Sequence, residues 1–248
     1  MDRIPSTEDS LRALLGRGLR IETVIDVGVH HATQKLMRAL PDAFHLLLEP
    51  TKEHADAIRA NYADFRYDLQ QVAVGDKDDD IWIVNLDIVG KGDVTHSRVV
   101  ATEAEAKSVA NQLENYAVPL RKLDTIMAAT DYTGPYLVKI DVDGFELQVL
   151  EGAKETLSRA AAVCIEAPRT ALSERLTWLE NAGYHLIDIV DIDYYQDTLW
   201  QVDLILVHKD VLRDTPALAP TIGPGEFDAK AYRSLRLPKK RFWSRNRR

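Results

Sequence analysis

Acidic residues stand at the ends of several apolar runs in this 248-residue sequence, where their side chains could do chemistry. Asp26 lies in the run VIDVG, Glu49 follows FHLLL, and Asp141 follows YLVKI. A carboxylate can accept hydrogen bonds from hydroxyl groups, pair with an ammonium group, take up a proton or hold a divalent cation. Because the carboxyl ends of parallel strands meet at one edge of a sheet, the pattern predicts a polar site there.

The first acid opens a turn that contains a single glycine. The turn reads DVGVHHA from Asp26, whereas a dinucleotide-binding fold would have Gly-x-Gly-x-x-Gly at this point. A carboxylate in place of the first glycine suits an ammonium group and repels a pyrophosphate. Gly28 is expected to let the backbone approach a ligand beside a helix N-terminus. The alternative is an ordinary strand-to-helix turn that needs one glycine.

The second acid, Glu49, follows Asp26 by 23 residues and precedes Pro50. At that distance a carboxylate can accept hydrogen bonds from the two hydroxyls of a ribose. The alternative is a solvated acid in a loop. Together the two acids favour S-adenosylmethionine, which has an amino acid at one end, a ribose at its centre and no phosphate.

The third and most informative segment is LVKIDVDGFELQVLEGA, residues 137–153. Strand alternation places Lys139 and Asp141 on one face, and Asp143, Gly144 and Glu146 follow in the turn and the first helical turn. We therefore expect three carboxylates and a lysine to converge. Two alternatives stay open: Glu146 could only stabilise the helix N-terminus, and Asp141 with Asp143 could hold Mg²⁺ or Mn²⁺, although no metal is predicted.

Three further residues carry weaker hypotheses. His96, in the segment GDVTHSR, is a candidate general base or an ordinary surface histidine. Glu166 ends another apolar run at the same edge of the sheet. Cys164 is expected to be a small buried hydrophobe, and as the single cysteine it cannot form an internal disulfide, which favours a reducing cytoplasm.

Apolar runs alternate with segments of helical spacing, which is typical of parallel strands covered by crossover helices. The expected strands are Thr23–Val27, Phe44–Leu48, Gln71–Val74, Tyr136–Ile140, Ala162–Ile165, His185–Val190 and Leu199–Val207. Helices are expected over Ser6–Gly16, Ala32–Ala39 and Lys52–Ala60, and around Leu147–Leu150 and Leu172–Leu179. The connection DIDYYQD is too short for a helical crossover, so the last strand should be antiparallel. The fold class is therefore α/β and Rossmann-like, with a β-rich insertion at 75–130.

Charge and composition exclude several classes of protein. The chain has 31 Lys and Arg against 39 Asp and Glu, a net charge of −8 that argues against a general nucleic-acid binder. No apolar run is long enough to span a membrane, and MDRIPSTEDS is too acidic for a signal peptide. We expect a domain over 1–212, a Pro/Gly-rich linker over 213–230 and a basic tail over 231–248. The tail either contacts anionic membranes weakly or is only solvated.

The whole pattern resembles the FkbM-type family of S-adenosylmethionine-dependent methyltransferases. The resemblance rests on VIDVGVHHATQ, LLLEP, QVAVGDKDDD, VPLRKLDTIM, VKIDVDGFELQVLEGAKETL and AVCIEAP. It implies a class I methyltransferase fold, with a doubly wound, mostly parallel seven-stranded sheet whose last strand is antiparallel. It also implies methyl transfer to a hydroxyl of a sugar, glycolipid or secondary metabolite. The chain has His30 and Ala32 where the family commonly has Asn and Gly.

The predicted site consists of residues from these segments. For cofactor binding these are Asp26, Gly28, His30, Glu49, Pro50 and Asp141. For catalysis they are Asp141, as base or orienting carboxylate, supported by Lys139 and Glu146, with His96 as a further candidate. Two rival functions remain: a nicotinamide-dependent oxidoreductase, which the missing glycines disfavour, and an inactive S-adenosylmethionine-binding module. The acceptor and the oligomeric state are left open.

Overall fold

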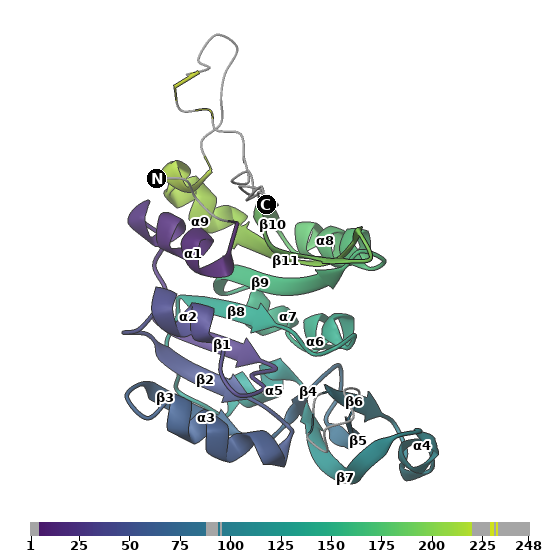
Figure 1. The fold of residues 1–248 in the computed structure, drawn as a ribbon. Coiled ribbons are helices and arrows are strands. Elements are labelled where there is room, and N and C mark those ends of the chain that lie inside the picture. Colours follow the sequence, from purple (N-terminus) through teal and green to yellow (C-terminus); the bar gives the residue numbers. More distant parts are fainter. Residues whose placement is uncertain (1–4, 88–93, 95, 220–228, 231, 233–248) are drawn as a thin grey trace, which may run out of the picture.

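Seven strands form the main sheet in the computed structural model, which describes residues 5–87, 94, 96–219, 229–230 and 232. The order across the sheet is β10-β11-β9-β8-β1-β2-β3 (Figure 1). These strands are β1 (Thr23–Val27), β2 (Phe44–Leu48), β3 (Arg66–Gln70), β8 (Tyr136–Ile140), β9 (Ala160–Pro168), β10 (Tyr184–Tyr195) and β11 (Thr198–His208). The pairs from β3 to β9 are all parallel, so the predicted α/β, Rossmann-like fold with a large, mostly parallel sheet is confirmed.

Strand β11 runs antiparallel to both of its neighbours, β9 and β10. The segment DIDYYQD, expected as a loop, instead extends β10 and leaves only Gln196 and Asp197 as the turn. Both residues have a positive φ, of 49° and 60°. This is the backbone conformation of a two-residue hairpin, whose twist matches that of the flanking strands.

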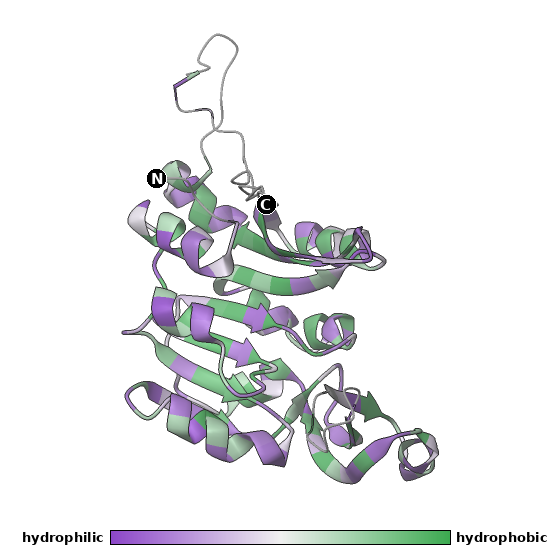
Figure 2. Ribbon diagram, viewed as in Figure 1, coloured by the Kyte–Doolittle hydropathy of each residue, from purple (hydrophilic) through white to green (hydrophobic). Residues whose placement is uncertain are grey.

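Helices cover both faces of the main sheet (Figure 1). One face packs against α1 (Thr7–Gly16), α2 (Gln34–Ala39) and α3 (Ala55–Asn61), which follows the 3₁₀ turn η1 (Lys52–His54). The other face packs against α5 (Leu123–Ala128), α6 (Glu146–Glu151), α7 (Lys154–Leu157) and α8 (Leu172–Asn181). The central strands β1 and β8 are buried along their whole length, which explains why they are mostly apolar (Figure 2).

The predicted third strand, Gln71–Val74, is wrong. The edge strand is β3, Arg66–Gln70, which pairs in parallel with β2 from Phe44↔Arg66 to Leu48↔Gln70. None of the five residues of β3 is fully buried, so RYDLQ contains no apolar run that would reveal it. The apolar residues Ala73–Val74 form β4, which belongs to a second sheet.

The second sheet has the order β4-β7-β5-β6. It consists of β4, β5 (Asp79–Leu86), β6 (His96–Val100) and β7 (Gln112–Arg121), accompanied by α4 (Glu103–Ser108). Its small core, with Ile81, Ile83 and Leu120 at the centre, packs against Phe145 beside α6. The second sheet therefore contacts the main domain near the carboxyl ends of its strands, and most of the loop GKGDVTHS lies outside the described residues.

Packed structure continues beyond the expected boundary at residue 212. Helix α9 (Lys209–Asp214) and the 3₁₀ turn η2 (Pro216–Leu218) follow the last strand, and Leu218 is buried in the same core cluster as Leu11. Most of the expected linker and almost all of the basic tail lie outside the described residues. Within the described part of the chain, no helix is long and apolar enough to cross a membrane.

Candidate functional site

A cavity of about 520 Å³ opens at the carboxyl ends of β1, β2 and β8. We call it the crevice, and its size falls within the usual range of ligand sites. Its wall is polar on one side, where it includes Gly28, His30, Glu49, Lys139, Asp141 and Asp203. On the other side it is apolar, with Val72, Ile83 and Val99 near or in the second sheet. The crevice is thus shaped for a ligand with one charged and one apolar end.

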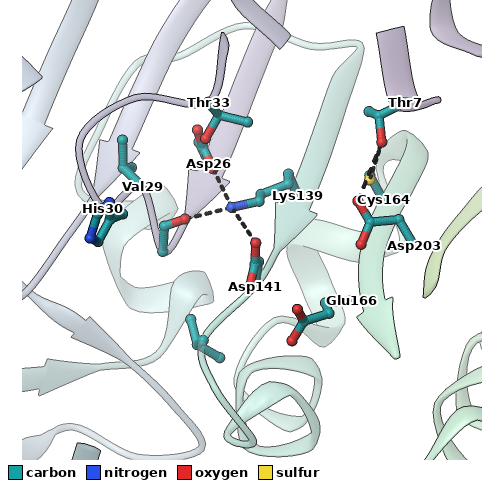
Figure 3. Close-up of polar contacts among 12 residues, drawn as sticks. Thr7, Asp26, Val29, His30, Thr33, Lys139, Asp141, Cys164, Glu166 and Asp203 are labelled. Carbon is teal, nitrogen blue, oxygen red and sulfur yellow. Dashed lines mark hydrogen bonds and ion pairs between the residues drawn. The ribbon is translucent and has the colours of Figure 1, made fainter. Parts of the chain in front are cut away.

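Lys139 stands at the centre of the polar wall (Figure 3). Its Nζ lies 3.3 Å from Asp26 Oδ1 and 3.3 Å from Asp141 Oδ2, and donates to the carbonyl oxygen of Gly28 at 2.5 Å. Burial lowers the pKa of this lysine, but the charges of Asp26 and Asp141 outweigh that effect and raise it. Lys139 is therefore a permanent cation that joins the ends of β1 and β8, and it is not placed to act as a base.

Asp26 is fully buried, which contradicts its predicted contact with the ammonium group of a ligand. Register places it beside Lys139 on the neighbouring strand, and that lysine is its cationic partner. Burial raises the pKa of Asp26, and the charge of Lys139 acts in the opposite direction. The carboxylate thus belongs to an internal ion pair that supports the site from below.

Gly28 is required for a reason other than the predicted approach to a ligand. Its φ is +83°, and a Cβ at this position would lie 1.8 Å from the carbonyl oxygen of Asp141. The neighbouring strand end fills the space that a side chain would need. The glycine therefore lets the ends of β1 and β8 approach each other, which brings Asp141 to the crevice.

Glu49 closes the turn after β1 from the adjacent strand end. It is only 5% exposed, and its Oε2 accepts hydrogen bonds from the backbone N–H of Val29 at 3.1 Å and of His30 at 2.8 Å. Its Oε1 accepts from the N–H of Thr51 at 2.9 Å. Burial raises the pKa of Glu49, but His54 and the backbone hydrogen bonds lower it by more, so the net shift of the pKa is downward. Glu49 is a charged carboxylate that lines the crevice and also shapes its loop.

Glu146 does not line the crevice and so is not placed to touch a ligand, while its predicted support of Asp141 stays a prediction. It is fully buried, and its Oε1 accepts from the N–H of Gly144 at 3.1 Å and of Val142 at 3.4 Å. Its Oε2 lies 2.5 Å from Nη2 of Arg175 in α8. Nη1 of Arg175 donates to the carbonyl oxygen of Glu166 at 2.6 Å. Glu146 and Arg175 thus fix the turn after β8, and nothing in the local sequence identifies the arginine.

Three carboxylates form a row across neighbouring strands at this edge. Asp203 pairs with Glu166, and Asp141 follows the pair Ile140↔Ile165, so it lies opposite Glu166 on the other side. Burial, with Asp141 as the next cause, raises the pKa of Glu166 to about 8 and that of Asp203 to about 7. The row can therefore hold protons near neutral pH, and a cationic ligand beside it would favour their release. Asp203 was not predicted from the sequence, because it lies within a strand and not at a strand end.

The other predicted residues have varied outcomes. His30 and Pro50 line the crevice. His96 begins β6, where its backbone pairs with Leu86, and its side chain lies outside what the structure describes, so its role as a base stays a prediction. Cys164 is buried, as predicted. Among the described residues, neither Asp141 nor its neighbours join a cluster of three metal-ligating side chains, so the Mg²⁺ or Mn²⁺ alternative gains no support.

A family model described as "Methyltransferase FkbM domain" matches residues 26–186 of the chain. The match includes β2, β8 and the last two residues of β1, whose ends form the crevice, and the turn that Glu146 holds. No protein of curated function matches the chain in sequence.

Several solved structures are similar to the chain at low sequence identity and low TM-score. A precorrin-6y C5,15-methyltransferase from Geobacter metallireducens is 12% identical, with a TM-score of 0.43, over 83% of this chain and 89% of that chain. An rRNA methylase from Streptococcus thermophilus is 8% identical, with a TM-score of 0.47, over 84% and 98%. A Streptococcus pneumoniae chain in complex with S-adenosyl-L-methionine is 11% identical, with a TM-score of 0.41, over 82% and 73%. Likenesses of this size do not identify an activity.

Proposed function

The chain belongs to the FkbM methyltransferase family, and from this premise we propose that it transfers the methyl group of S-adenosylmethionine to a hydroxyl oxygen of a sugar, glycolipid or secondary metabolite. The observation that carries the proposal is the row of Asp141, Glu166 and Asp203, of which Asp141 and Asp203 line the crevice. S-adenosylmethionine is cationic at its sulfonium and ammonium groups and has no phosphate. An acidic wall attracts such a ligand and repels a dinucleotide.

The crevice offers a complementary group for each part of this ligand. The side chain of Asp141 is 43% exposed, so this carboxylate, and not the buried Asp26, is the proposed partner of the ammonium group. Glu49 is the proposed acceptor for a ribose hydroxyl. The apolar wall at Val72 and Val99 is the proposed site of the adenine ring. The residues present therefore fit the cofactor along its length.

The protein's task in this reaction is alignment and proton removal. S-adenosylmethionine supplies the electrophilic methyl group when it is bound. Lys139 holds Asp141 and the Gly28 carbonyl in fixed positions, which orients one wall of the crevice. A general base works best with a pKa near the working pH. Asp203, with a pKa of about 7, lines the crevice and is the proposed acceptor of the hydroxyl proton, in place of Asp141.

Partners and location follow from weaker observations. We propose no nucleic-acid partner, since the net charge is −8, and a reducing, cytoplasmic location, since the chain has one cysteine. The basic residues of 231–248 are the basis for proposing weak contact with anionic membranes.

Titration calorimetry of the full chain tests cofactor choice. We expect S-adenosylhomocysteine to bind and NAD not to bind. Asp141→Asn should weaken S-adenosylmethionine binding by about 1–3 kcal/mol, the range for a charge-assisted hydrogen bond. Asp56→Asn, whose side chain is 99% exposed on α3, is the matched control and should bind like the wild type. Binding of NAD alone would overturn the proposal in favour of the oxidoreductase.

A turnover assay tests the reaction itself. The chain is incubated with methyl-labelled S-adenosylmethionine and with glycan, glycolipid and metabolite extracts, and labelled products are fragmented by mass spectrometry. We expect the label on an oxygen as an ether that survives alkali. Asp203→Asn should lose transfer but retain S-adenosylhomocysteine. Label found only on nitrogen or carbon refutes O-methyl transfer, and binding without any transfer favours the inactive binding module.

A further inference from the structure

Three histidines meet beside the crevice, which His30 and His54 line, and no step of the proposed methyl transfer uses their rings. His30 and His31 lie in the turn after β1, and His54 ends η1. Ring centroids are 3.9 Å apart for His30–His31, 4.3 Å for His30–His54 and 4.8 Å for His31–His54. One nitrogen from each ring lies within 4.8 Å of the others. In the described part of the chain, this is the one group of three or more side chains close enough to share a metal ion.

The buried ring of His54 is an independent observation that points to a ligand. It is 4% exposed, and among the described residues its Nε2 has no hydrogen-bond partner. Buried polar atoms are nearly always bonded, so an imidazole in this state calls for a partner. The carboxylate of Glu49 lies 3.5 Å from Nδ1 of His54, the position from which a carboxylate orients a metal-bound histidine.

The backbone holds the two other rings in place. His30 has φ 55°, in the left-handed region that residues other than glycine rarely adopt, and its N–H donates to Glu49. Such conformations persist where surrounding bonds impose them and are common at ligand sites. The same carboxylate thus positions the loop of His30 and faces the ring of His54.

We propose that His30, His31 and His54 bind one divalent transition-metal ion of the zinc class, oriented by Glu49, with a fourth position open to water. Zinc–nitrogen bonds of about 2.0–2.1 Å require nitrogens about 3.3 Å apart in a tetrahedron. His30 and His31 are exposed and His54 is buried, so metal binding would require the two exposed rings to move the remaining distance toward His54. Neutral imidazoles suit Zn²⁺ and its neighbours in the transition series and do not suit Mg²⁺.

The test uses the full chain, freed of metal with a chelator and then titrated with ZnCl₂ by calorimetry and with CoCl₂ by visible absorption. We expect one ion per chain and the absorption bands of a tetrahedral cobalt site. His30→Asn, since asparagine tolerates a positive φ, and His31→Gln should each weaken zinc binding at least about tenfold. His185→Gln, exposed on β10, is the matched control and should bind like the wild type. Circular dichroism confirms that each variant is folded.

Two results would overturn the site: no saturable binding of one zinc ion, or binding that is as tight in folded His30→Asn and His31→Gln as in the control. The inference does not depend on methyl transfer, because zinc binding is measured without cofactor and S-adenosylhomocysteine binding is measured in chelator. Zinc binding without S-adenosylhomocysteine binding would support this site and count against the proposed function.

Discussion

The buried pair of Glu146 and Arg175 predicts a large loss of stability when the arginine is replaced. Their side chains are 0% and 4% exposed, and the pair distance is 2.5 Å. Arg175→Met leaves the carboxylate of Glu146 buried without a cation and removes a donor from the carbonyl of Glu166. Breaking a buried ion pair in this way costs about 3–5 kcal/mol. A domain is stable by about 5–15 kcal/mol in total, so the variant should lie close to unfolding.

Urea denaturation at pH 7, followed by circular dichroism, measures this loss. The double variant Glu146→Gln/Arg175→Met removes both charges, while the glutamine oxygen can still accept from the N–H of Gly144. It should therefore recover part of the loss, with an interaction energy of about 1–3 kcal/mol in the cycle. Lys107→Met is the matched control. Its pair with Glu103 is 2.5 Å long but its side chain is 65% exposed, so the change should be smaller than about 1 kcal/mol.

An Arg175→Met protein as stable as the Lys107→Met control would refute this reasoning. So would a Glu146→Gln variant that keeps full stability but loses methyl transfer, because that outcome would give Glu146 a catalytic role. The expected pattern is the reverse: stability falls first, and activity falls only as the turn after β8 loses its support.

Three further predictions concern other parts of the molecule. Gly28→Ala should lower the melting temperature strongly, because its Cβ would meet the carbonyl of Asp141 at 1.8 Å; an unchanged melting temperature would show that the strand ends can separate. The folded pKa values of Glu166, about 8, and Asp203, about 7, exceed the unfolded values of about 4. The stability that these two acids contribute to the fold is therefore complete below about pH 4 and is lost as the pH rises through 7–8. Urea denaturation in steps from about pH 5 to 9 should show falling stability that Glu166→Gln with Asp203→Asn flattens; an equally steep fall in the double variant would contradict this assignment. Removing residues 231–248 should leave S-adenosylhomocysteine binding unchanged and reduce sedimentation with anionic vesicles at low salt; equal sedimentation of both forms would leave the tail without a membrane role.

The sequence by itself determined the strands that are buried on both faces. β1, β2 and β8 have the predicted bounds, because a central parallel strand is mostly apolar and its type shows in the sequence even where single polar residues such as Asp26, His45 and Lys139 interrupt it. It also placed Asp141 and Glu49 at strand ends, since parallel strands put those ends at one edge. The edge strand β3 was missed for the complementary reason: its residues are half exposed, and its sequence is mostly polar.

Only the tertiary structure decided what each carboxylate near these strand ends does. Asp26, Glu146 and Asp141 are chemically alike in the sequence, yet the first is buried against Lys139, the second is bonded to Arg175, and the third faces the crevice. These differences depend on residues from strands and helices far away in the chain, whose pairing sets burial and partner charge. Local spacing predicts where a carboxylate stands, but its solvation and its partners, which determine whether it can act on a ligand, arise only when the sheet and its helices pack together.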